Sequence, residues 1–253
     1  KPTVGTQCGG AVALETFTPA GAGQAFGVDA DGSHVVGYSS DDGITRAAQW
    51  LDFGPMLVLA DLPGGIDYAR ARATSADGAV TVGDSSGADG IEAVLWSGGA
   101  PLGLGDIVGG GFQSVARAIS SDGSTVVGVA RSARGDEACI FDPTGLTEPV
   151  GLGDLAGGPY FSEANATSDD GRVIVGRSAA DSGSRAFLWT EWTGMVDLRV
   201  LLEDEYGLGD QVAGWALEVA EDISADGLTI VGFGRNPDNE TEGAGLLCLF
   251  KNG

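Results

Sequence analysis

ISSDGSTVVG, residues 119–128, is the stretch that decides the fold, because close copies of it occur four more times along the chain. The other copies are VDADGSHVVG (28–37), TSADGAVTVG (74–83), TSDDGRVIVG (167–176) and ISADGLTIVG (223–232). Their closing glycines are separated by 45 to 56 residues. A period of this size indicates an array of equal supersecondary units. Since a repeated framework describes the scaffold, function is expected in the parts that vary between copies.

The third repeat divides into four short strands at its turn residues. We predict strands over Ser114–Ser120, Thr125–Ala130 and Ala138–Phe141, and a fourth strand around residues 150–155. Asp122-Gly123 between the first two strands is a strong hairpin signal, because both residues tolerate positive φ. An aromatic residue closes the third strand of each copy, at Trp50, Trp96, Phe141, Trp189 and Phe250. Four-stranded units with a recurrent aromatic residue are typical of β-propeller blades.

The two ends of the chain suggest how the blades close into a ring. The fifth repeat lacks a fourth strand, and an additional apolar strand, Ala11–Phe17, precedes the first repeat. We therefore predict an all-β, five-bladed β-propeller with four-stranded antiparallel blades, in which the N-terminal strand completes the last blade and removes a free sheet edge. The single domain spans residues 1–253, with blades at about 22–65, 66–110, 111–158, 159–209 and 210–250 plus 11–17.

Composition and charge narrow the functional classes. The 253 residues contain 36 Asp and Glu but only 13 Lys and Arg, so the formal net charge is −23. Nucleic acid is not an expected partner, because phosphate binding needs clustered cations. No apolar run is long enough to predict membrane insertion. The chain has no initiator Met and no signal-peptide pattern, so we interpret it as a processed, extracellular or cell-surface protein, and we expect a monomer.

Three segments resemble a known family of repeats. They are ISADGLTIVG (223–232), RAFLWTEWTGMVDL (185–198) and GLGDLAGG (151–158). They are similar to the bacterial extracellular HAF repeats, whose pattern joins a His-Ala-Phe strand to a Gly-Met-x-Asp-Leu-Gly element. The resemblance covers about residues 12–250 and implies a secreted, often surface-associated protein without catalytic residues to carry over. The eponymous His is absent, and Ala-Phe follows Arg185 instead.

The loops that would share one face of the propeller carry the candidate ligand-binding residues. These are Trp215, Tyr68, Phe112, Tyr160, Arg235, Asp238 and Glu240. Aromatic rings beside carboxylate and guanidinium groups suit a sugar-binding surface, because the rings stack on sugars and the polar groups bond hydroxyls. The alternative is that each aromatic residue packs between blades. Trp215 stands out because the connection over residues 201–216 is the longest between blades.

A second variable set occupies one equivalent position of the first strand in each repeat. Its members are Phe26, Arg72, Arg117, Asn165 and Glu221. They are expected either to line the central channel or to pair across blades. Pairing is the favoured interpretation, because acids and bases alternate without a focus.

The predicted function is a non-enzymatic recognition or scaffold module that binds carbohydrate or a cell-surface partner through the loop face. The alternatives are an exported glycoside hydrolase with loop-face carboxylates and a structural passenger domain of a surface protein. No catalytic residue, cofactor or metal site is assigned, and Ca²⁺ bound by the Asp-rich loops Ser39–Gly43 and Gly234–Glu242 is a weaker alternative. His34 follows a turn and is assigned to the surface.

The three cysteines allow one bridge. Cys8 directly precedes the N-terminal strand, and Cys248 lies in the strand that would pair with it. A Cys8–Cys248 disulfide is a candidate if the two Cα atoms come within about 7 Å. Cys139 is expected to remain a buried thiol.

Overall fold

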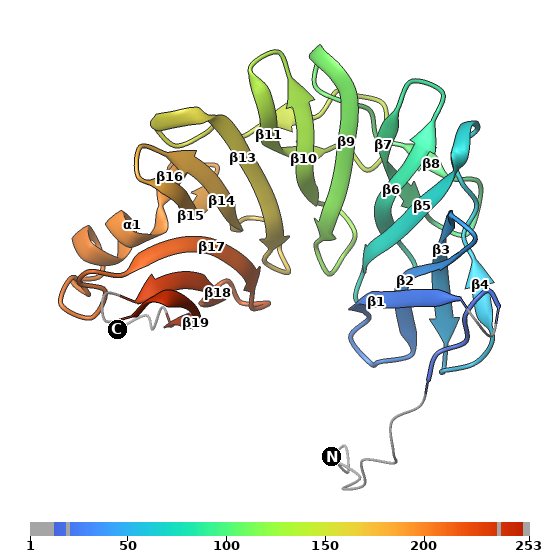
Figure 1. Cartoon of the computed structure of the whole chain (residues 1–253), viewed down its shortest axis with the longest axis horizontal. Helices are drawn as coiled ribbons and strands as arrows, with labels where there is room; N and C mark the ends of the chain where they lie inside the picture. Colours follow the sequence, from blue (N-terminus) through green and yellow to red (C-terminus); the bar gives the residue numbers. More distant parts are fainter. Residues whose placement is uncertain (1–12, 19–20, 237–238, 250–253) are drawn as a thin grey trace, which may run out of the picture.

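The computed structural model describes residues 13–18, 21–236 and 239–249. It is an all-β protein of β-propeller type, in which five antiparallel units follow one another along an arc (Figure 1). Four units have four strands each, and the described part of the fifth has three. Each of the five sequence repeats therefore lies in one of these units.

The strands have the following bounds. The first unit contains β1 (Ala22–Val28), β2 (His34–Asp41), β3 (Ile44–Leu51) and β4 (Met56–Val58). The second contains β5 (Gly64–Thr74), β6 (Thr81–Gly87), β7 (Ile91–Trp96) and β8 (Leu102–Gly103). The third contains β9 (Gly109–Ile119), β10 (Val126–Ser132), β11 (Gly135–Phe141) and β12 (Val150–Gly151). The fourth contains β13 (Gly157–Thr167), β14 (Ile174–Ala180), β15 (Gly183–Thr190) and β16 (Gly194–Asp197), and the fifth contains β17 (Ala216–Ile223), β18 (Thr229–Asn236) and β19 (Asn239–Leu249).

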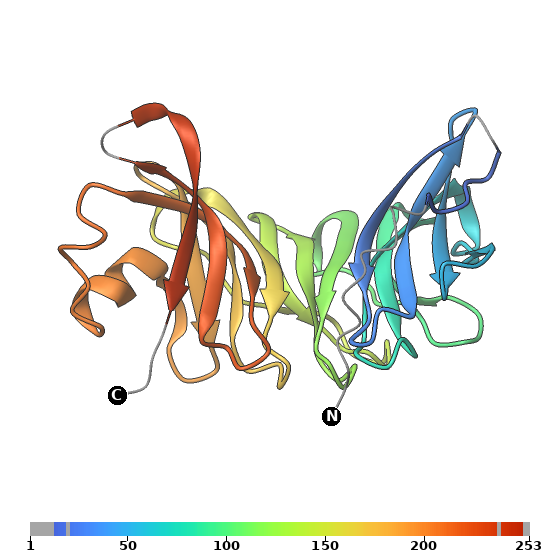
Figure 2. The same ribbon diagram turned by 90° about the horizontal axis from the view of Figure 1, so that it is seen from below.

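The sheet topology contradicts the predicted closed, five-bladed ring. Two parallel contacts, Thr45 with Tyr68 and Ile91 with Gln113, join the first three units into one mixed sheet of 12 strands. The strands β13–β16 and β17–β19 form two separate sheets, and none of the sheets is closed. Figure 1 and Figure 2 both place the first and the last unit at opposite ends of the arc. The fold class is therefore an open all-β array.

The turn glycines show where the array is open. At each of the four boundaries between units, a residue at the start of the second strand of one unit contacts the turn glycine of the next unit. The contacts are His34 with Gly78, Val80 with Gly123, Thr125 with Gly171 and Val173 with Gly227. The turn glycine of the first unit, Gly32, has open space where a Cβ would lie, with no described atom within 4 Å. The contact that would join the last unit to the first is missing among the described residues.

The predicted N-terminal closing strand is also wrong for the residues that the structure describes. Residues 13–17 form no strand and lie against the first unit. The Trp50 indole N–H donates to the Glu15 carbonyl at 2.9 Å, as the Trp96 indole N–H donates to the Ala60 carbonyl at 2.8 Å. Ala60 lies in the connection that enters the second unit. In both units, the segment that precedes the first strand packs across the tryptophan of that same unit. Within the described part of the chain, residues 13–17 therefore contact the first unit and not the fifth.

Each repeat glycine faces an alanine across a β-bulge. Gly128 pairs with Ala116, and the register then shifts so that Val127 pairs with Ala118 and Arg117 is left over. The same shift occurs in the other units at Phe26, Arg72, Asn165 and Glu221. A Cβ on any of the five repeat glycines would overlap a carbonyl oxygen of the bulged strand. Close backbone approach therefore accounts for the conserved spacing of glycine within the repeat.

The apolar core lies between neighbouring units. Leu95 and Leu104 of the second unit, for example, share one buried cluster with Val126 and Phe141 of the third. Burying a side chain of this kind contributes about 1.5–3 kcal/mol. Cys139, which lies in the same cluster, is a buried free thiol as expected, and burial raises its pKa well above the usual value. Cys8 and the side chain of Cys248 lie outside the described residues.

A short helix replaces part of the predicted fourth strand in the fourth unit. The strand β16 ends at Asp197, and α1 (Leu198–Asp204) follows it. The Asp197 side chain caps the helix by accepting from the Arg199 N–H at 2.8 Å. Leu198 and Leu202, four residues apart, are both buried. This spacing is the helical period, which the prediction of an all-β chain overlooked.

In the second to fifth units, the turn between the first and the second strand is held by a recurring serine–aspartate pair. In the third unit, the Ser120 hydroxyl donates to Asp122 at 2.7 Å, and the Ser124 backbone N–H donates to the same carboxylate oxygen at 2.9 Å. The Ser120 oxygen accepts from the Thr125 N–H at 2.9 Å. Hydrogen bonds from Ser124 and Ser120 lower the pKa of Asp122 to about 2.

This lowered pKa makes the turn sensitive to acid. A carboxyl group with a folded-state pKa below its unfolded value of about 3.9 stabilises the fold fully above about pH 4, and this contribution is lost as pH falls through about 2. We expect Asp122→Asn to be less stable than the wild type at neutral pH and the deficit to shrink as pH falls toward about 2. Urea unfolding of both proteins over this pH range measures the deficit. A deficit that does not change with pH would contradict the assignment.

Candidate functional site

The five residues left over at the β-bulges line one hollow at the inner edge of the units. This central hollow is bordered by Phe26, Arg72, Arg117, Asn165 and Glu221 and has a volume of about 270 Å³. Each residue comes from a different inner strand, β1, β5, β9, β13 or β17 (Figure 1). A bulge adds one residue to a strand and re-aims its side chain. The repeat thus presents one variable side chain per unit to a common space.

A buried carboxylate holds Arg72. The Arg72 Nε–H donates to Asp84 Oδ1 at 2.5 Å, and the Tyr68 hydroxyl donates to Asp84 Oδ2 at 2.9 Å. Asp84 is only 1% exposed. Burial and the adjacent charge of Asp84 raise the pKa of Tyr68 to about 12, so the phenol stays protonated and keeps donating. Arg72 therefore has a fixed orientation at the hollow.

A second buried carboxylate holds Arg117. Glu163 accepts from Arg117 Nη2 at 2.7 Å and from the Arg177 Nε–H at 2.5 Å. Burial lowers the pKa of Arg117, and the nearby charges of Arg72 and Arg177 act in the same direction. An arginine remains charged nonetheless. Asn165 accepts a long contact from Arg117 Nη1 at 3.5 Å and donates to the Ala220 carbonyl at 2.9 Å.

The residues that line the hollow carry more positive than negative charge. Behind them, the buried carboxylates of Asp84 and Glu163 are bonded by Arg72, Arg117 and Arg177. In the lining itself, Arg72 and Arg117 stand against the one carboxylate of Glu221. The local balance is one positive charge in a chain whose net charge is −23. The expected pairing across blades is found at Arg117, which bonds Glu163 of the next unit. Arg72 instead bonds Asp84 of its own unit, and both arginines also line the hollow.

An aromatic surface completes this region. Phe26 is 39% exposed, and its ring centroid lies 5.7 Å from that of Tyr38. The Arg72 guanidinium lies over the Phe26 ring at 5.7 Å, and the Arg70 guanidinium lies over Tyr38 and Tyr68 at 5.0 and 5.3 Å. These contacts stiffen the arginines next to an apolar ring face.

The loop residues predicted to bind a ligand take part in separate contacts. Tyr68 belongs to the network of Asp84, and the Tyr160 hydroxyl accepts from Arg134 Nη2 at 3.0 Å. Phe112 is 37% exposed. The Arg235 Nε–H donates to Glu218 at 2.6 Å. Tyr68 is linked to the central hollow through Asp84 and Arg72. A ligand-binding role for all of these residues stays a prediction.

Trp215, the most prominent of the predicted residues, is partly buried. It packs against the cluster that contains Leu198 and Leu202 of α1, and its carbonyl accepts from Arg199 Nη1 at 3.1 Å. This environment matches the alternative interpretation of an aromatic residue that packs between elements. Asp238 and the side chain of Glu240 lie outside the described residues.

Two carboxylates in the third strands of the second and third units support backbone turns. Glu92 accepts from the Gly105 N–H at 3.0 Å, and Glu137 accepts from the Gly153 N–H at 3.1 Å. Burial raises the pKa of Glu92. No cluster of three or more metal-ligating side chains occurs within the described residues, where no helix is long and apolar enough to cross a membrane either.

The key residue that sequence reasoning missed is Asp84. It directly follows the repeat glycine Gly83, where other units have Tyr38, Val129, Arg177 and Phe233. An aspartate in the middle of a predicted strand was an available signal, because a buried charge must be paired. Its partner across the strands could not be read from the sequence.

Comparisons with known proteins support the fold alone. No family model matches the chain, and no curated protein sequence matches it. In structure it is similar to a TolB-type protein from Agrobacterium tumefaciens, with a TM-score of 0.56, 14% identity, and coverage of 86% of this chain and 71% of that chain. It also matches TolB from Acinetobacter baumannii, with a TM-score of 0.48, 17% identity, and coverage of 66% and 40%. The expected membership of the HAF family is wrong, because no family model matches and the structural likeness is to a TolB-type protein.

Proposed function

We propose that the chain is a non-enzymatic recognition module that binds an acidic carbohydrate in the central hollow. The observation that supports this proposal is the convergence of Arg72, Arg117 and Asn165 on one space beside the exposed ring of Phe26. The proposal keeps the carbohydrate partner and the extracellular or cell-surface location expected from the sequence. It moves the binding site from the loop face to the inner strands.

The chemistry of the hollow favours a carboxylated sugar over a neutral one. Guanidinium groups bind carboxylates through directed, charge-assisted hydrogen bonds. Arg72 and Arg117 are oriented by Asp84 and Glu163, so little side-chain freedom is lost on binding. The Phe26 ring can stack on the apolar face of a sugar. A volume of about 270 Å³ suits one sugar unit of a longer chain.

A matched pair of ligands tests the proposal. Trigalacturonate and its methyl ester have the same sugar framework, but only the first carries negative charge. By isothermal titration calorimetry, we expect the wild-type protein to bind the acid at least about tenfold more tightly than the ester. The preference should decrease as salt increases, because ions screen the guanidinium charges. Equal binding of the two ligands would overturn the proposal.

Two variants and one control locate the site. Arg117→Gln removes a charge at the hollow, and Phe26→Ala removes the exposed ring. Arg172→Gln removes the same charge from a turn, where the Arg172 side chain is 84% exposed. We expect the first two variants to bind trigalacturonate at least about tenfold more weakly and the control to bind like the wild type. Circular dichroism checks that each variant is folded. Release of new reducing ends during the titration would favour the hydrolase alternative instead.

A further inference from the structure

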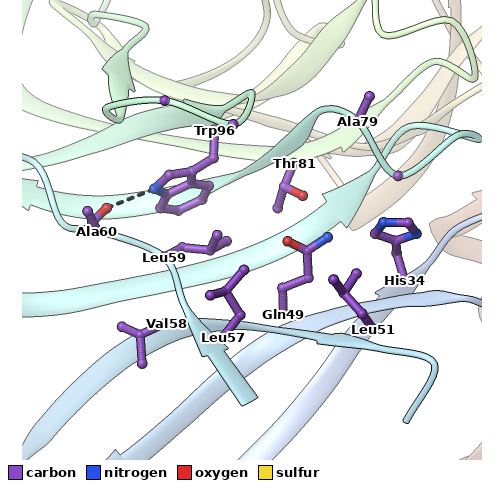
Figure 3. A pocket seen from close by; sticks show the side chains of 13 residues that line it. His34, Gln49, Leu51, Leu57, Val58, Leu59, Ala60, Ala79, Thr81 and Trp96 are labelled. Carbon is purple, nitrogen blue, oxygen red and sulfur yellow. Dashed lines mark hydrogen bonds between the residues drawn. The ribbon is translucent and has the colours of Figure 1, made fainter. Parts of the chain in front are cut away.

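A larger cavity lies between the first and the second unit. This first inter-unit groove has a volume of about 460 Å³, and Figure 3 shows the side chains that face it. Its polar lining consists of His34, Gln49 and Thr81. Leu51, Leu57, Val58, Leu59 and Trp96 form most of its apolar wall. The side chain of His34, which the sequence assigns to the surface, is 28% exposed at this groove.

The repeat itself provides the comparison that makes this groove unusual. Three positions of the repeat meet at each boundary between two described units. Two of them come from the first unit of the pair: the residue three before its repeat glycine, and the residue just before the aromatic residue of its third strand. The other comes from the next unit and lies two residues before that unit's repeat glycine. Between the second and third units they are Val80, Leu95 and Val126. At the next two boundaries they are Thr125, Ile140 and Ile174, then Val173, Leu188 and Ile230. At the first boundary they are His34, Gln49 and Thr81.

At the other boundaries these positions fill the core. Leu95 and Val126 belong to one buried cluster, with Val80 packed against it. Ile174 and Ile230 are buried in the clusters at the following boundaries, with Ile140 and Leu188 packed against them. Only the first boundary has a polar side chain at all three positions. A groove opens at the same place, and polar groups there must find partners or remain unsatisfied.

His34 is held by a buried carboxylate. Its Nδ1 lies 2.7 Å from Asp29 Oδ2, and the His34 backbone N–H donates to Asp29 Oδ1 at 3.0 Å. Burial opposes the charge of Asp29, but the hydrogen bonds from His34 and Ser33 outweigh it and lower the pKa of Asp29 to about 2. Because the ionised carboxylate only accepts, Nδ1 carries the proton. In the neutral form of the ring, the Nε2 atom is left as an acceptor.

The other two polar groups have weak or no partners among the described residues. The Gln49 side-chain amide makes no hydrogen bond within the part of the chain that the structure describes. The Thr81 hydroxyl has one long contact, 3.4 Å to Thr74. The Trp96 indole N–H, in contrast, is occupied by the Ala60 carbonyl, so the ring offers the groove only apolar surface (Figure 3).

We propose that the first inter-unit groove binds a neutral small molecule that has an apolar body and a hydroxyl or N–H donor. The apolar body contacts Leu57, Leu59 and Trp96, and the donor reaches His34 Nε2 or the Gln49 carbonyl oxygen. The volume lies within the range of about 300–1,000 Å³ found for ligand pockets, which are mostly apolar with a few polar groups. An anion is disfavoured, because no Lys or Arg lines the groove and Asp29 stands behind His34.

Three matched probes test the class of ligand. They are 4-propylphenol, which has a donor, propylbenzene, which has none, and 4-propylbenzoate, which is anionic. Ligand-observed NMR measures their dissociation constants with the whole chain. We expect 4-propylphenol to bind at least about tenfold more tightly than either of the other two. Undetectable binding of 4-propylphenol, or equal binding of all three probes, would overturn the proposal.

The repeat framework supplies the variant that locates the site. His34→Val/Gln49→Leu/Thr81→Val gives the first boundary the residues of the second. We expect this variant to melt at a higher temperature than the wild type, because apolar side chains fill the groove, and to lose at least about tenfold in affinity for 4-propylphenol. Gln49→Leu alone keeps the test valid if the triple variant does not fold. Leu146→Ala, at a side chain that is 85% exposed, is the control that should change neither property. Unchanged affinity in Gln49→Leu and in the triple variant would exclude the groove as the binding site.

Discussion

Replacing Gly128 with Ala is expected to destabilise the protein by at least about 3 kcal/mol, at the upper end of the cost of overpacking. The reason is geometric. Gly128 faces Ala116 across the bulge at Arg117, and a Cβ on Gly128 would overlap the carbonyl oxygen of Val115. Backbone atoms of a paired strand cannot move aside as the end of a flexible side chain can. The strand β10 would have to separate from β9, which removes ladder hydrogen bonds and displaces Arg117 from the central hollow.

A control in the same unit separates this effect from the intrinsic cost of the substitution. Gly111 lies in β9, where an added Cβ would meet no atom within 4 Å. Gly111→Ala should therefore stay within about 0.5 kcal/mol of the wild type. Guanidinium chloride unfolding, followed by circular dichroism, gives both free energies. If the two variants are equally stable, the close approach at the bulge is not what requires glycine in the repeat.

The sequence predicted the local structure well because the repeat signals are local. The Asp-Gly turns, the alternating strands and the aromatic residue at the end of the third strand each depend on neighbouring residues. Closure of the ring was predicted wrongly, because it depends on where residues 13–17 pack. Their position is decided by the Trp50 indole and Met56, both in the first unit. Nothing in the pattern of the segment itself distinguishes a contact with the first unit from a contact with the last.

The sites were predictable to different degrees. Alignment of the repeats predicted that Phe26 and Arg117 occupy one equivalent position. It did not predict the β-bulge that turns both side chains toward a common space. The buried acids that orient the arginines come from other strands, so their role needed the structure. The groove at His34 was not predicted, because its three polar residues are far apart in the sequence. Gln49 stands where other repeats have Leu95, Ile140 and Leu188, but only the structure brings it to the same cavity as His34 and Thr81.

Replacing Glu163 with Gln is expected to cost about 2–3 kcal/mol of stability. Glu163 is only 7% exposed and bonds both Arg117 and Arg177. Removing one partner of a fully buried ion pair costs about 3–5 kcal/mol, because the remaining charge loses its compensation. The cost is smaller here, since the side chains of Arg117 and Arg177 are 32% and 39% exposed and water can solvate them.

A second ion pair gives the matched control for this substitution. Glu203 bonds Arg199 at 2.7 Å, four residues apart on α1, and its side chain is 33% exposed against 9% for that of Glu163. Glu203→Gln should therefore cost only about 0.3–0.5 kcal/mol. Urea unfolding of both variants measures the difference. Glu163→Gln should also weaken trigalacturonate binding, because Arg117 loses the carboxylate that orients it toward the hollow. If Glu163→Gln were as stable as Glu203→Gln, water alone would compensate the charges of Arg117 and Arg177. The guanidinium groups at the hollow would then not be held rigidly by Glu163, and carboxylate recognition depends on that rigidity.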